Sequence, residues 1–316
     1  MSFFARRLQE EGAMLAPMAS FTDAPFRLQA ERFGALWTVG EMVMSRSLLQ
    51  GAPAAWELLR FDGEESARVV QLAGADPEEV AAAAELVARR VRPLAIDLNM
   101  GCPMPKVVSR GAGAALLDDP ERAARMVAAV RRATGLPVSV KLRLGNRRQT
   151  IMEVAPALQE AGAELLRVHG RTASQRYGGQ ADWEKIAAVA ALLRIPVVGS
   201  GDVRHPDDYR RGRALGLGVA LARGALGRPW FFAEIRGVPV SAREKKEAAL
   251  AHLRAHLNWY AHRGEARALR AFRGHLAGYL AVAGAPAAER RRALLGESAA
   301  GVAAVLERWV GASEAT

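Results

Sequence analysis

The stretch Leu94-Ala95-Ile96-Asp97-Leu98-Asn99, followed directly by Met100-Gly101-Cys102-Pro103, decides the fold of this chain. A short, largely apolar run that ends in a turn of glycine and proline is typical of a buried β-strand. Seven further runs of this kind alternate with longer, alanine-rich amphipathic segments. Such alternation is the sequence pattern of βα units that build a parallel sheet.

Eight βα units are expected in residues 1–240. Their number and length predict an α/β fold, a (β/α)8 TIM barrel, with a doubly wound open sheet as the alternative. The expected strands span residues 13–18, 36–42, 68–73, 94–99, 137–142, 164–169, 195–200 and 218–223. The expected helices span residues 24–34, 46–51, 76–90, 114–134, 150–161, 182–193, 205–215 and 229–235.

The expected strands end in polar side chains. Active sites of this fold lie at the face where the strands have their C-terminal ends. The groups expected at that face are Glu41, Gln71, Asn99, Cys102, Lys141, Arg143, His169, Arg171, Ser200, Asp202 and Arg223. So many polar groups at the ends of apolar strands predict a ligand site at the mouth of the barrel.

The pattern changes after Pro239, beyond which no strand-like run occurs. Helices are expected at 241–262, 265–282, 287–295 and 298–312, so we expect a catalytic barrel (1–240) followed by a small C-terminal helical bundle (241–316). The bundle has a net charge of +5, which makes it denser in positive charge than the barrel at +6. Its arginines Arg263, Arg267, Arg270 and Arg273 recur at helical spacing, which fits either a solvated helix face or a surface that binds a polyanion.

The composition limits the class of protein. A net charge of +11 favours a polyanionic partner such as nucleic acid. No stretch approaches the roughly 20 apolar residues of a membrane-spanning helix, and no secretory signal is recognisable. The single cysteine fits the reducing cytoplasm, where we expect the protein to be located. We also expect a monomer without an obligate protein partner, and no metal, since neither clustered cysteines nor a His-Glu-x-x-His motif is present.

Cys102 is a candidate catalytic residue because it follows a strand in a loop of glycine and proline. An ordinary thiol is mostly protonated at neutral pH, so Cys102 could act as a general acid. Nucleophilic attack would instead need a neighbouring cation to stabilise the thiolate, and Lys106 and Arg110 are near in sequence. Spacing alone leaves both roles open, as well as that of an inert buried thiol.

A phosphate-bearing cofactor is the expected ligand of the barrel mouth. Lys141 and Arg143 alternate on one strand and therefore point to the same side. Ser200-Gly201-Asp202 and Arg223-Gly224-Ala225 follow the last two strands, whose loops often bind phosphate in this fold. His169 precedes Gly170-Arg171-Thr172 and is either a donor to an anion or a structural histidine.

Several segments together resemble the bacterial tRNA-dihydrouridine synthases. The most specific are Asn99-Met100-Gly101-Cys102-Pro103 and His169-Gly170-Arg171-Thr172. The others are Ala16-Pro17-Met18, Val70-Gln71-Leu72-Ala73-Gly74, Val140-Lys141-Leu142-Arg143, Gly201-Asp202-Val203 and the run from Arg223 to Trp230. The resemblance runs in order through the barrel and more loosely into residues 270–280.

The resemblance implies a barrel that binds FMN and a bundle that helps to bind tRNA through Arg267, Arg270 and Arg273. NADPH, or NADH, would reduce FMN, the reduced flavin would give hydride to C6 of a uridine, and Cys102 would protonate C5. The substrate side would hold Asn99, Lys141, Arg143, His169 and Arg171. The flavin would contact Ala16, Pro17, Met18, Gln71, Lys141 and His169, and its phosphate Ser200, Gly201, Asp202, Ala222 and Arg223.

Two residues depart from the family pattern, and two other functions compete with it. Ser200 stands where Asn is common, and Ala222 stands where Gly is common. Both residues are small, so phosphate binding should survive with a lower cofactor affinity. The alternatives are an FMN-dependent barrel that reduces a small molecule, and a non-catalytic RNA-binding protein. The first leaves the basic bundle without a role, and the second leaves Cys102 without one.

Overall fold

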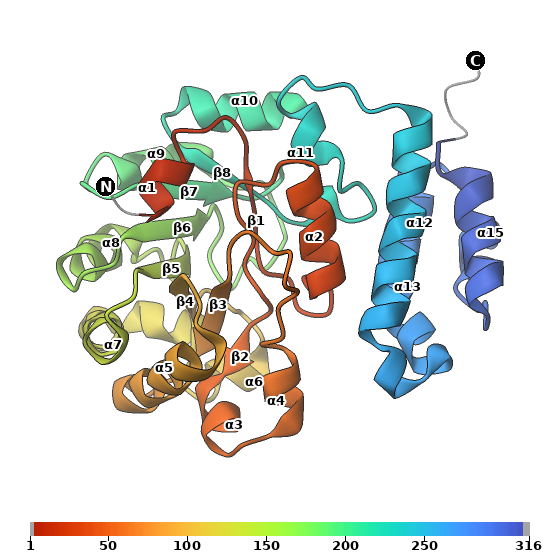
Figure 1. Cartoon of the computed structure of the whole chain (residues 1–316). Coiled ribbons are helices and arrows are strands. Elements are labelled where there is room, and N and C mark those ends of the chain that lie inside the picture. The colour runs from red at the N-terminus through yellow and green to blue at the C-terminus, as the bar shows by residue number, and fades with distance from the viewer. Residues whose placement is uncertain (1–2, 312–316) are drawn as a thin grey trace.

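The structure, a computed structural model, describes residues 3–311. Parallel strands curl around a central axis with helices outside them, and the C-terminal helices stand to one side, next to α2 (Ala24–Arg32) (Figure 1). The strands are β1 (Met14–Leu15), β2 (Val43–Met44), β3 (Val69–Ala73), β4 (Ala95–Met100), β5 (Val138–Arg143), β6 (Leu165–His169), β7 (Val197–Ser200) and β8 (Gly218–Leu221). This arrangement confirms the predicted TIM barrel.

The sheet closes on itself. Consecutive strands pair in parallel from β2 to β8, and β8 pairs with β1. Closure lies between β1 and the segment before β2, where Leu15 bridges Thr38 and the Leu15 N–H donates to Trp37 O over 3.0 Å. The expected strand 36–42 was wrong in position, because that segment pairs through single hydrogen bonds with different neighbours and the regular ladder forms only at β2.

The outer helices largely follow the predicted segments. They are α3 (Ser45–Leu49), α4 (Pro53–Glu57), α5 (Pro77–Val91), α6 (Pro105–Val108), α7 (Pro120–Thr134), α8 (Ile151–Glu160), α9 (Trp183–Ala190), α10 (Pro206–Ala214) and α11 (Phe231–Glu234), with α1 (Phe3–Arg7) before β1. The expected continuous helix 114–134 is divided into a 3-10 turn, η1 (Gly113–Asp118), and α7. The break occurs because Asp119 caps α7 by accepting from the Arg122 N–H, and Pro120 cannot continue a preceding helix.

The C-terminal bundle consists of α12 (Ala242–Trp259), α13 (Glu265–Val282), α14 (Ala287–Ala293) and α15 (Ala299–Trp309). The first expected helix was too long, since α12 is followed by a 3-10 turn, η3 (Ala261–Arg263), and by Gly264 at φ 80°. Arg263 therefore lies outside α13 and does not share a helix face with Arg267. The end of the last expected helix, at residue 312, lies outside the described residues.

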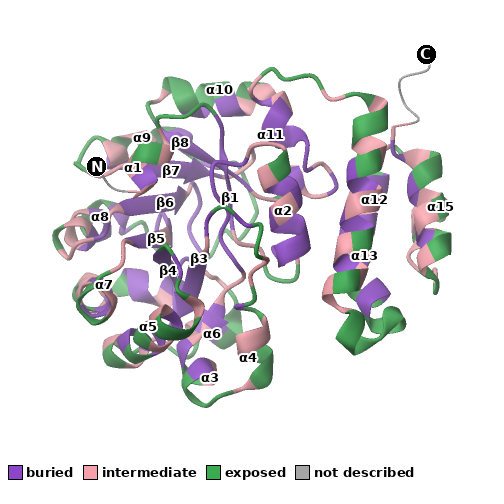
Figure 2. Ribbon diagram, in the orientation of Figure 1, coloured by how far each residue is buried: buried purple, intermediate pink, exposed green. Residues whose placement is uncertain are grey.

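Two groups of apolar side chains matter for the site. Most residues of the barrel strands are buried, whereas the outer faces of the helices are exposed (Figure 2). The bundle has an apolar cluster of its own, built around Leu253, Phe272 and Leu306, which also takes in Trp230 from the end of the barrel. Among residues 3–311, no helix has the length and apolar character needed to cross a bilayer.

Candidate active site

A pocket of about 110 Å³ lies at the C-terminal ends of β5 to β8. Most of the side chains that the sequence assigned to the mouth of the barrel line it. These are Ala16, Pro17, Met18, Lys141, Arg143, His169, Ser200, Gly201, Asp202, Ala222 and Arg223. The pocket forms because the strands are parallel and all end at this face.

Two glycines allow the loops that border this pocket to pack closely together. Gly201 has φ +125°, and a Cβ there would lie 2.5 Å from the Ala181 side chain. A Cβ on Gly224 would lie 2.2 Å from Val203 O. Glycine is therefore required where the loops after β7 and β8 meet, at the face where this fold often binds phosphate.

Asp202 and Arg171 bind one another. Arg171 is buried and donates to Asp202 Oδ2 over 2.6 Å, to Gly179 O over 2.6 Å and to Gly178 O over 3.0 Å. Burial raises the pKa of Asp202, but the hydrogen bonds from Arg171 and the Ala181 N–H, together with the nearby positive charge, outweigh it and leave the pKa below its ordinary value. The guanidinium thus fixes the loop between β6 and α9 to the loop after β7.

Arg143 also holds loops together. Its guanidinium donates to Gly101 O over 3.0 Å, and to Thr172 O and Arg176 O, each over 2.9 Å. The first of these carbonyls belongs to the loop that carries Cys102. Arg143 therefore connects the cysteine loop with the loop after β6, and at the same time borders the pocket.

The loop of Cys102 is held by the side chain of Asn99. Asn99 Oδ1 accepts from the N–H groups of Gly101, at 3.2 Å, and Cys102, at 2.9 Å. Its Nδ2 donates to Gln71 Oε1 over 2.9 Å. The amide of Asn99 is therefore engaged on both ends, and the thiol that it positions is half-buried beside the strand that carries Lys141.

A polar network that the sequence reasoning missed lies beneath this loop. Asp97 accepts from Gln71 Nε2 over 2.5 Å, from Ser139 Oγ over 2.6 Å and from Arg167 over 2.6 Å. All of these side chains are buried. The available signal was the presence of Asp97 and Arg167 in the middle of apolar strands, since a buried charge requires a partner. The network connects the barrel interior to Asn99.

The electrostatics of the mouth favour an anionic ligand. Burial, together with the charges of Arg167 and Arg143, lowers the pKa of Lys141 to about 7. Burial and the charge of Lys141 lower the pKa of His169 to about 2, so this imidazole is neutral at physiological pH. A cluster of cations with few acidic neighbours stabilises negative charge that is placed among them.

Tyr177 is a pocket residue that the sequence reasoning did not select. It stands on the loop between β6 and α9, with its ring 4.2 Å from the Arg223 guanidinium and 6.5 Å from the His169 ring. Its side chain is 58% exposed. The sequence signal was an aromatic residue followed by two glycines in a loop at the active face.

The three bundle arginines lie on α13. Arg267 and Arg270 are exposed, whereas Arg273 is half-buried. Arg263 instead pairs with Glu57 of the barrel and is absent from this group. Two exposed cations and one partly covered cation thus occupy the helix where the sequence predicted a polyanion-binding face.

The fold and the pocket define a class of protein, a TIM barrel with a cationic mouth and one positioned thiol. The family model described as dihydrouridine synthase matches residues 14–308. A probable tRNA-dihydrouridine synthase of Rhizobium leguminosarum bv. phaseoli is 38% identical over 272 residues, 84% of each chain. The chain belongs to the dihydrouridine synthase family.

Further comparisons agree with this assignment. The tRNA-dihydrouridine synthase B of Pseudomonas aeruginosa is 39% identical over 281 residues, covering 85% of this chain and 83% of the relative. A solved 2-naphthoyl-CoA reductase complex is similar in structure with a TM-score of 0.50 at 12% identity, covering 72% of this chain and 50% of that one. The structural likeness extends to the fold alone.

Proposed function

We propose that this protein reduces specific uridines of tRNA to 5,6-dihydrouridine, with FMN bound at the barrel mouth and NADPH or NADH as reductant. The observation that carries the proposal is the position of Cys102, whose loop Asn99 holds beside the cationic pocket. The chain belongs to the dihydrouridine synthase family, which agrees with this position. The alternative of a small-molecule reductase gives no role to the exposed arginines of α13.

The donor groups of the pocket fit FMN. Arg223 and Lys141 supply positive charge, and Gly201 and Gly224 allow the loops after β7 and β8 to meet beside them. We assign Ala16, Pro17 and Met18 to the flavin ring, with Gln71 held nearby in the network of Asp97. Ser200, Gly201, Asp202, Ala222 and Arg223 would surround the phosphate.

The volume of the pocket adds a requirement. At about 110 Å³ the pocket is smaller than the roughly 300–1,000 Å³ typical of cofactor sites. Tyr177 covers part of the mouth from an exposed loop position. We infer that its ring moves aside when the cofactor enters, while Arg171 holds the backbone of Gly178 and Gly179 in place.

When bound and reduced, FMN supplies the hydride that C6 of the uracil accepts. The protein supplies the proton: the Cys102 thiol donates to C5, and its sulfur is left as a thiolate. Lys141 and Arg143 are close enough for their charges to interact with that of Cys102 and therefore stabilise the thiolate. Because Cys102 is half-buried, solvent can return the proton.

The substrate must leave its RNA stack to reach this pocket. Enzymes that act on a base generally extrude it, and contacts with the phosphate backbone elsewhere hold the RNA in place. We propose that residues 241–316 form the tRNA-binding domain, with Arg267, Arg270 and Arg273 contacting phosphates, and that residues 1–240 form the catalytic domain.

Mass spectrometry of tRNA tests the proposed function directly. The purified protein, with FMN and NADPH, should add two hydrogen masses to uridines of unmodified tRNA. In a strain that lacks the gene, one or more positions should lose this increment. Unchanged tRNA in both experiments would refute the proposed activity.

A further inference from the structure

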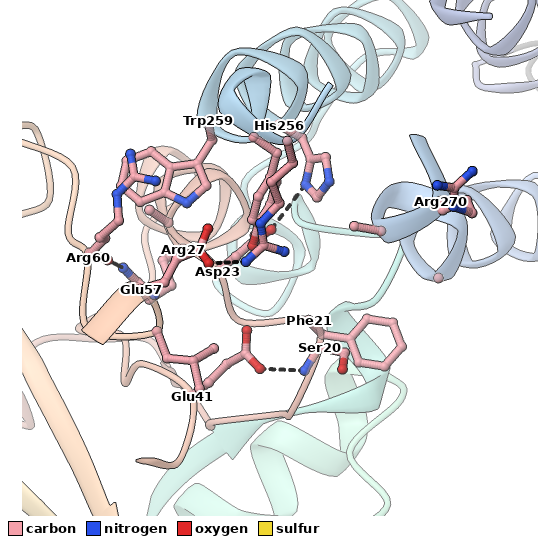
Figure 3. A pocket seen from close by; sticks show the side chains of 16 residues that line it. Ser20, Phe21, Asp23, Arg27, Glu41, Glu57, Arg60, His256, Trp259 and Arg270 are labelled. Atoms are coloured by element: carbon pink, nitrogen blue, oxygen red, sulfur yellow. Dashed lines mark hydrogen bonds and ion pairs between the residues drawn. The ribbon is translucent and has the colours of Figure 1, made fainter. Parts of the chain in front are cut away.

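A second, larger cavity lies where the barrel meets the bundle. Its volume is about 460 Å³, and α2, α12 and α13 contribute to its walls. Figure 3 shows Asp23 and His256 facing one another on its inner side, with Arg270 nearby. This cavity is separate from the pocket at the mouth, and the proposed reaction makes no use of its histidines.

Three side chains converge beside this cavity from two parts of the chain. His252 and His256 are four residues apart on α12, so they lie on the same helix face. Asp23 is the N-cap of α2, where its Oδ1 accepts from the Phe26 N–H over 3.1 Å. Packing of α12 against α2 brings Oδ2 next to His256, and the Tyr260 hydroxyl also hydrogen-bonds to the Asp23 carboxylate.

The geometry of the three groups is compact. His256 Nδ1 lies 3.0 Å from Asp23 Oδ2. One ligand atom from each of Asp23, His252 and His256 lies within 4.8 Å of the other two. The relative exposures are 9%, 0% and 1%. The groups are thus removed from solvent, where an unpaired polar atom is costly.

One ring nitrogen in this cluster has no partner, and another faces only the Asp23 carboxylate. In the described part of the chain, His252 Nε2 has no hydrogen-bond partner, and His256 Nδ1 has Asp23 Oδ2 at 3.0 Å. The opposite nitrogens do have partners, with Tyr279 Oη 3.0 Å from His252 Nδ1 and Ala268 O 3.2 Å from His256 Nε2. A histidine that binds a metal characteristically has its second nitrogen held in this way.

We propose that Asp23, His252 and His256 form a binding site for one divalent transition-metal ion, with Zn²⁺ as the preferred ion. Two tetrahedral ligands at about 2.0–2.1 Å from Zn²⁺ lie roughly 3.3 Å apart, close to the observed separation of Asp23 and His256. His252 approaches further to complete the set. The cavity beside Asp23 and His256 provides the entry path.

His275 is a candidate for a fourth ligand. Both of its ring nitrogens lack hydrogen-bond partners, although the residue is 1% exposed. Its ring centroid lies 4.5 Å from that of His252 and 6.1 Å from that of His256. Four ligands would make the site a closed, structural one, which ties the bundle to the barrel.

Part of the proposed metal site could be recognised in the sequence. The expectation of no metal rested on missing cysteine clusters and a missing His-Glu-x-x-His motif. His252-Leu253-Arg254-Ala255-His256 nevertheless has the spacing that presents two histidines on one helix face. The third ligand lies 229 positions earlier in the chain, so only the packing of α2 against α12 reveals it.

Metal binding to the full chain tests the proposal. The protein is treated with a chelator, then titrated with Zn²⁺, and bound metal and melting temperature are measured. We expect one tightly bound Zn²⁺ per chain and a higher melting temperature, because an ion that binds the folded state stabilises it. Co²⁺ should give the absorption bands of a tetrahedral site. No binding by the wild-type protein would overturn the proposal.

Matched variants separate a metal site from ordinary packing. Asp23→Asn keeps a good N-cap and should therefore fold, yet lose Zn²⁺ affinity, as should His252→Gln and His256→Gln. Tyr279→Phe, which releases His252 Nδ1, should weaken binding about 10- to 100-fold. His205→Gln, on the distant helix α10, and Cys102→Ala should bind as the wild type does. Undiminished binding by Asp23→Asn and His256→Gln would show that the cluster is only a buried ion pair.

Discussion

Cys102 has a defined position because the side-chain amide of Asn99 accepts hydrogen bonds from two consecutive N–H groups of its loop. Proton donation from a positioned group is generally worth about 10²–10⁴ in rate. We expect Cys102→Ala to retain FMN and tRNA affinity but to lose turnover by about that factor, as measured by NADPH oxidation in the presence of tRNA. Full activity would exclude Cys102 as the proton donor.

In the protein without cofactor, burial of the Lys141 charge destabilises the folded state at neutral pH. Its pKa falls from 10.5 to about 7 on folding, so the unfolded chain binds more protons between these values. Stability therefore rises as the pH increases through this window, and the full cost of burying the charge is present below pH 7. Methionine has a side chain of similar length to that of lysine but carries no charge, so Lys141→Met removes the cost of burying the charge.

We accordingly expect Lys141→Met to raise the melting temperature of the FMN-free protein at pH 6, by an amount that shrinks towards pH 10. The same variant should bind FMN more weakly, because it loses a cation of the pocket. Thermal unfolding at several pH values, with wild-type protein as reference, measures the effect. An equal difference between the two proteins at every pH would contradict the proposed titration of Lys141.

At the scale of elements, the backbone of the loop between β6 and α9 is held on both sides of Tyr177, while the Tyr177 ring is exposed. Arg143 and Arg171 bind its carbonyl groups, while Tyr177 extends over Arg223. We expect Tyr177→Ala to bind FMN with a higher association rate, since the mouth is then less obstructed. Stopped-flow quenching of flavin fluorescence gives this rate. Tyr177→Phe keeps the ring and should behave like the wild type; equal rates for all three proteins would mean that the ring does not gate entry.

At the scale of the whole molecule, the charge of +11 is spread over barrel and bundle, so tRNA affinity should depend strongly on salt. Replacement of Arg267, Arg270 and Arg273 by alanine should weaken binding and reduce the slope of log Kd against log salt by up to about 3. Filter binding at several salt concentrations measures this slope. Replacement of Arg290, Arg291 and Arg292 on α14 makes the same change in charge and serves as the control. A similar loss in both variants would indicate general attraction instead of a binding face.

The local sequence pattern was sufficient to predict the barrel and many of the residues at its mouth. Alternating apolar runs gave seven of the eight strand positions closely, and the polar residues at the ends of the last four strands marked pocket-lining groups such as Lys141 and His169. These features are readable because the periodicity of an element is local and the parallel topology brings every strand end to one face.

The sequence by itself determined the fold, the position of Cys102 and the basic character of the bundle. Only the tertiary structure decided the partners of the polar groups: Arg143 with the Cys102 loop, Arg171 with Asp202, and Asp23 with His256. The irregular second strand and the place of Tyr177 over the mouth also came from the structure alone. The physical reason is that a hydrogen bond joins groups that are adjacent in space, and in a closed barrel such neighbours lie tens to hundreds of positions apart in the chain.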